Sequence, residues 1–146
     1  MRKINYIVVH CSATREGCTL TSEVLEAEHR RRAFRTTGYH YYIRRDGTVL
    51  GTRSLELPGA HCRGHNKYSI GICYEGGLDA RGNPKDTRTP EQRSALHLLV
   101  YQLLQQFRNA RVCGHRDLSP DLDGDGTVEP WEWVKQCPCF EVSKEF

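Results

Sequence analysis

The chain has 146 residues, the size of one domain with a single core, and we expect residues 1–146 to form that domain. Its 21 Lys and Arg residues nearly balance its 18 Asp and Glu residues, and a net charge of +3 is too mild to predict a nucleic-acid partner. The seven cysteines are an odd set without the spacing of a small disulfide scaffold, which favours free thiols.

No apolar run reaches the roughly 18 residues that a membrane-spanning helix needs, so we expect no membrane insertion. The apolar stretch at residues 4–9 is also shorter than the core of a secretory signal. We therefore expect synthesis in the cytoplasm.

The first half of the chain predicts a strand, a helix and a hairpin. Residues 4–10 are rich in β-branched side chains and predict a buried strand that ends near His10. Residues 22–34 contain strong helix formers and predict a helix. The Asp46-Gly47 pair predicts a tight turn that joins strands at 39–44 and 48–53, because Gly tolerates a positive φ.

The second half predicts strands at 69–74 and 110–114 and two helices. Thr89-Pro90-Glu91-Gln92 has the pattern of a capping box with proline in the first turn, and apolar residues follow at helical spacing. Residues 131–136 predict a short helix that positions Lys135 and Cys137. Alternating strands and helices indicate an α/β fold with a central mixed β-sheet flanked by helices.

Three separated residues could form a metal site. His10 follows a strand, His115 follows another, and Cys137 lies near the C-terminus. Two histidines and a cysteine form one type of catalytic zinc site, in which three protein ligands leave a fourth position open for water. Spacing alone does not prove that these residues converge.

The sequence around these residues resembles the type 2 N-acetylmuramoyl-L-alanine amidases, a family that includes phage lysozyme-type amidases and peptidoglycan recognition proteins. The resemblance extends over residues 4 to 140 and rests on segments that recur in order: Val9-His10-Cys11-Ser12-Ala13-Thr14, Gly38-Tyr39-His40-Tyr41, Arg45-Asp46-Gly47-Thr48-Val49, Ala60-His61, Asn66, Ser69-Ile70-Gly71-Ile72-Cys73, Gly114-His115 and Lys135-Gln136-Cys137-Pro138.

The resemblance implies a zinc-dependent hydrolase with the amidase and peptidoglycan-recognition-protein fold. Its substrate would be bacterial peptidoglycan or muropeptides, cleaved between N-acetylmuramic acid and L-alanine after the protein is released or exported. Zn²⁺ would be held by His10, His115 and Cys137. Tyr39 and Lys135 match the family's catalytic residues, and His61 and Asn66 fall where the family contacts substrate.

Two alternatives remain at this stage. Cys139 could replace Cys137 as the sulfur ligand, although the Lys-x-Cys-Pro context favours Cys137. The protein could also be a non-catalytic peptidoglycan-binding module, but such relatives lack the cysteine ligand. The other histidines are expected to pack or lie at the surface, and His40 should point to the opposite face of the sheet from Tyr39.

The chain departs from the compact members of the family between His115 and Cys137. The inserted residues 121–132 match a twelve-residue calcium loop, with oxygen-bearing side chains at loop positions 1, 3, 5, 7, 9 and 12. These are Asp121, Asp123, Asp125, Thr127, Glu129 and Glu132. Pro120 opposes this interpretation because it prevents the usual incoming helix, so Ca²⁺ and an ordinary acidic loop both remain open.

Overall fold

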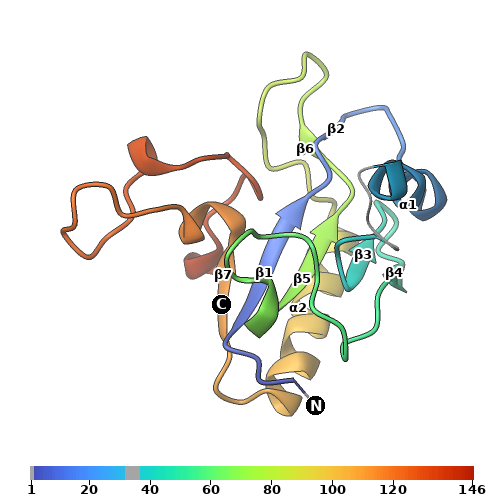
Figure 1. Cartoon of the computed structure of the whole chain (residues 1–146). Helices are drawn as coiled ribbons and strands as arrows, with labels where there is room; N and C mark the ends of the chain where they lie inside the picture. The colour runs from blue at the N-terminus through green and yellow to red at the C-terminus, as the bar shows by residue number, and fades with distance from the viewer. Residues whose placement is uncertain (1, 32–36) are drawn as a thin grey trace.

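A five-stranded mixed sheet forms the centre of the protein, as the sequence predicts. The structure is a computed structural model that describes residues 2–31 and 37–146 (Figure 1). The strand order is β4-β3-β5-β1-β7, and only β4 runs antiparallel to its neighbour. The strands are β1 (Tyr6–Cys11), β3 (Tyr41–Ile43), β4 (Val49–Gly51), β5 (Ser69–Tyr74) and β7 (Arg111–Gly114).

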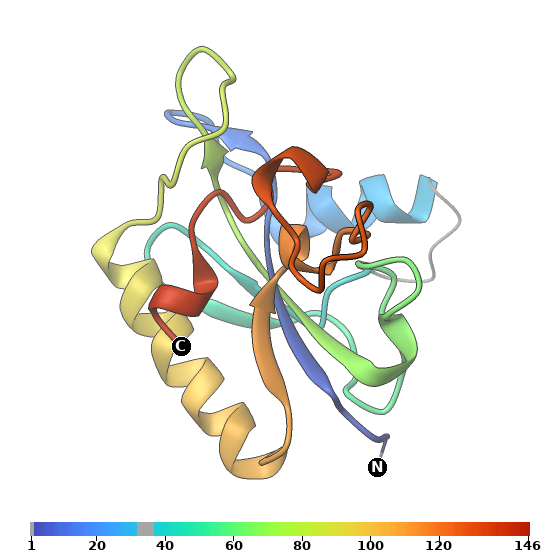
Figure 2. The same cartoon turned by 90° about the vertical axis from the view of Figure 1, so that its left-hand side faces the viewer.

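Helix α2 (Pro90–Gln106) covers one face of the sheet, as Figure 2 shows. Its first turn is held by the predicted capping box, in which Thr89 and Gln92 each accept the other's backbone N–H. Leu96, Leu99, Val100 and Leu103 are buried against apolar side chains of the sheet. The apolar stripe predicted for this helix therefore forms one side of the main core.

Helix α1 (Ser22–Arg31) lies over the other face. Its Leu25 packs with Tyr42 and Cys73 in a second, smaller core cluster. The helix begins where the sequence predicts, and residues 32–34 of the predicted helix lie outside the described residues. The two faces of the sheet thus have different roles, because α2 covers a mainly apolar face and α1 shares its face with the polar side chains of the site.

Two features differ from the sequence prediction. A short parallel pair, β2 (Thr14–Arg15) with β6 (Gly77–Leu78), extends beyond the sheet. The prediction of a helix at 131–136 is wrong, because a single 3₁₀ turn spans Pro130–Glu132. Trp133 is extended, with its ring 3.9 Å from the Arg116 guanidinium, and this tertiary contact ends the turn.

Further 3₁₀ turns lie at Asn66–Tyr68, His115–Leu118 and Val142–Lys144. Within the described ranges, no helix has the length and apolar character needed to cross a bilayer.

Candidate metal centre

His10 lies near the end of strand β1, between β5 and β7, and faces the α1 side of the sheet. Its neighbours Val9 and Cys11 belong to the core cluster on the α2 side, so strand alternation turns His10 the other way. The side chain is 1% exposed. Burial lowers the pKa of His10 well below its usual value, and the nearby His61, His115 and Lys135 lower it further. His10 is therefore a neutral imidazole at physiological pH, the form that binds metals.

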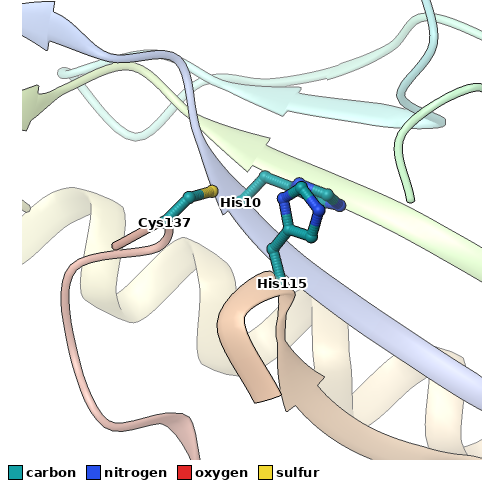
Figure 3. A group of neighbouring side chains, drawn as sticks. All are labelled: His10, His115 and Cys137. Carbon is teal, nitrogen blue, oxygen red and sulfur yellow. The ribbon is translucent and has the colours of Figure 1, made fainter. Parts of the chain in front are cut away.

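His115 and Cys137 reach the same point from separate segments (Figure 3). Strand β7 runs parallel to β1 and pairs Gly114 with Val9, so His115 emerges beside His10 with ring centroids 4.6 Å apart. The Arg116 N–H donates to the Cys137 carbonyl at 2.9 Å. The Cys11 N–H donates to the Cys137 sulfur at 3.1 Å.

These three side chains fit a zinc ion. Their ligand atoms all lie within 4.8 Å of one another. Zn–N and Zn–S bonds of about 2.0–2.3 Å in a tetrahedron separate ligand atoms by roughly 3.3–3.7 Å, so small side-chain rotations would complete the site. Two imidazoles and one thiolate are also a donor set that zinc prefers.

A cavity of about 340 Å³ opens beside the three side chains, and its lining includes Tyr39, His115, Lys135 and Cys137. The Tyr39 ring lies 5.1 Å from that of His10. Burial raises the pKa of Tyr39 well above 10, so its phenol keeps its proton. A second cavity of about 590 Å³ shares His115 and Lys135 with the first and continues along Arg63. The centre thus lies where two hollows meet.

His61 and Asn66 lie near the candidate metal centre, but their hydrogen bonds are made mainly inside the protein. His61 lines the smaller cavity, yet it is only 9% exposed. The Asn66 side-chain oxygen accepts the backbone N–H groups of His61 and Cys62, both at 2.9 Å. Substrate contact by these two residues stays a prediction, while their hydrogen bonds lie within the protein.

Two other histidines contact the neighbourhood of the site. His40 is fully buried and hydrogen-bonds to the Leu57 carbonyl and the Gly71 N–H, as a packed histidine would. His29 was expected only to pack or lie at the surface, but it lines the smaller cavity and its ring lies 5.4 Å from that of Tyr39. The sequence pattern of the predicted helix at 22–34 did not indicate that His29 would face this cavity.

Cys139 points away from the group of His10, His115 and Cys137. Its sulfur lies 3.9 Å from that of Cys11 and donates to the Gly77 carbonyl at 3.3 Å. Cys137 is therefore the sulfur that the structure places with the two histidines.

The predicted calcium loop folds back on itself, and its carboxylates form two groups. Asp121, Asp123 and Glu132 make one group, and Asp123, Asp125 and Glu129 the other. Backbone N–H groups of the loop already donate to Asp121 and Glu132. Hydrogen bonding to Glu132 and Asp125 raises the pKa of Glu129 to about 8. Thr127 is exposed, and calcium binding stays a prediction.

Comparisons with known proteins point to one family. The sequence profile described as N-acetylmuramoyl-L-alanine amidase matches residues 1–138. The endolysin of Klebsiella phage KP32 is 34% identical over 98% of this chain and 85% of its own length. The endolysin of Escherichia phage T7 is 32% identical over 94% of this chain and 82% of its own length.

A solved structure has the same fold. The N-acetylmuramoyl-L-alanine amidase LysC from Clostridium intestinale URNW superposes with a TM-score of 0.76 at 26% identity, covering 99% of this chain and 82% of that chain. The profile match spans nearly the whole sequence, including all three residues of the metal group. The chain belongs to the N-acetylmuramoyl-L-alanine amidase family.

Proposed function

We propose that this protein is a zinc-dependent amidase that hydrolyses the amide between N-acetylmuramic acid and L-alanine in bacterial peptidoglycan. The observation that carries the proposal is the convergence of His10, His115 and Cys137 beside an open cavity, in a chain of this family. Residues 1–146 act as one domain, which reaches the wall polymer after release or export from the cytoplasm.

His10, His115 and Cys137 would hold the zinc ion, and three protein ligands would leave one position open to water and substrate. Zinc, when bound, lowers the pKa of water to about 7 and polarises the amide carbonyl. The protonated phenol of Tyr39 donates a hydrogen bond to the oxygen that becomes negative in the transition state. The Lys135 ammonium, on the shared wall of both hollows, donates there and assists proton transfer to the departing amine.

The shape of the cleft suits a substrate that extends to both sides of the reacting amide. The two cavities meet at His115 and Lys135. Peptidoglycan has a glycan with its lactyl group on one side of that amide and a peptide on the other. We assign one cavity to each side of the amide.

Mass analysis of the products released from purified peptidoglycan tests the proposal. We expect stem peptides with a free L-alanine amine, no release after treatment with a zinc chelator, and recovery when zinc is restored. The His115→Ala variant is the matched control and should release nothing. Cleavage within the glycan or the peptide would refute the assignment, and binding without products would favour the non-catalytic binding module.

A further inference from the structure

A second histidine lies directly behind His10. The His61 Nδ1 atom is 2.8 Å from the His10 Nε2 atom, and the two rings are nearly perpendicular at 88°. Both side chains are buried, at 9% and 1% exposure. This contact is therefore a hydrogen bond within the protein interior, where leaving either nitrogen unpaired would be costly.

The position of His61 is itself fixed on several sides. Its Nε2 atom lies 3.1 Å from the hydroxyl of Ser69, a residue with no exposed surface. Asn66 holds the backbone N–H of His61. A side chain on Gly71 would place its Cβ 2.6 Å from the His61 ring, so only glycine leaves room for the ring in this place.

The hydrogen bond decides which nitrogen of His10 can hold a metal ion. Because Nε2 faces His61, Nδ1 is the nitrogen that remains for the ion. A nitrogen that binds a metal carries no proton, so the proton of neutral His10 must be on Nε2, where His61 accepts it. His61 then carries its own proton on Nε2 and donates it to Ser69.

We propose that His61 is a positioning residue of the metal centre, which accepts the Nε2–H of His10 and so orients its Nδ1 toward the ion. The inference rests on the zinc site proposed above and adds a specific role for His61. An outer hydrogen-bond partner of this kind fixes the tautomer and ring orientation of a ligand, and its loss lowers metal affinity about 10- to 100-fold.

Zinc affinity measured by competition with a chromophoric chelator tests the proposal. We expect His61→Leu, which keeps bulk but removes the acceptor, to bind zinc about 10- to 100-fold more weakly than wild type. His61→Asn places an amide oxygen near the position of Nδ1 and should recover most of the affinity. A residue that only fills space would show the opposite order, because leucine fills the site better than asparagine.

His40→Leu is the matched control, since His40 is also a buried histidine but bonds to backbone groups and Arg2. It should lower the melting temperature of the zinc-free protein and leave zinc affinity within about threefold of wild type. Equal zinc affinity of wild type and His61→Leu, or equal weakening in His61→Leu and His61→Asn, would overturn the role of His61 but not the metal centre. Absence of zinc binding in wild type would instead overturn the metal centre and this inference with it.

Discussion

Replacing Tyr39 with phenylalanine separates chemistry from metal binding. The change removes one hydroxyl and keeps the ring, which lies 5.1 Å from the ring of His10 and 5.4 Å from that of His29. We therefore expect the variant to fold and to hold zinc as wild type does. The hydroxyl is the part that we assign to the transition state.

The size of the effect follows from the environment of the phenol. Burial raises the pKa of Tyr39 well above 10, so the hydroxyl is a proton donor throughout the neutral range. One donor to a developing oxyanion is worth about 2.7–4 kcal/mol, which corresponds to a loss in kcat of about 100- to 1,000-fold. KM should change little, because the interaction strengthens only in the transition state.

The assay measures kcat and KM on a soluble muramoyl peptide together with zinc content by elemental analysis. Tyr42→Phe is the matched control: the Tyr42 hydroxyl donates to the Leu20 carbonyl at 2.6 Å, and Tyr42 does not line either of the two cavities. That control should lose about 1 kcal/mol of stability and keep its kcat. A kcat of Tyr39→Phe within threefold of wild type, at full zinc content, would remove Tyr39 from the mechanism.

Three further predictions concern the metal, acid stability and the acidic loop. Cys137→Ser should weaken zinc binding more than about 100-fold and abolish hydrolysis, whereas Cys139→Ser should keep both; the reverse result in zinc titrations would show that the sulfur ligand is misassigned. Burial lowers the pKa of His40 to about 4, against about 6.5 in an unfolded chain, so its contribution to stability is full above pH 6.5 and is lost as the pH falls toward 4. Urea unfolding of the zinc-free protein measures how the free energy of unfolding changes with pH in that window. The slope should be smaller in His40→Gln than in wild type by up to about 1.4 kcal/mol per pH unit, and equal slopes would contradict the assignment. Millimolar calcium should raise the melting temperature at fixed zinc, and no shift, or the same shift in an Asp121→Ala, Glu132→Ala double variant, would leave the loop as an ordinary acidic segment.

Local sequence signals predicted most of the secondary structure. The strand at β5 and the helix after the Thr89 capping box were readable because their causes are local: β-branched runs, helical spacing of apolar residues and a cap that bonds to its own first turn. The helix predicted at 131–136 failed because its end is set by a distant contact, the packing of Trp133 on Arg116. The sequence around residues 131–136 does not show that this contact forms.

The residues of the candidate site were named from the sequence, but their relation to one another was decided only by the tertiary structure. His10, His115 and Cys137 come together because two parallel strands end side by side and a loop returns to the first of them. The hydrogen bond between His10 and His61 forms because the fold buries both rings next to each other. Residue types thus determine the available chemistry, whereas strand register and burial determine which nitrogen faces the ion and which faces the protein.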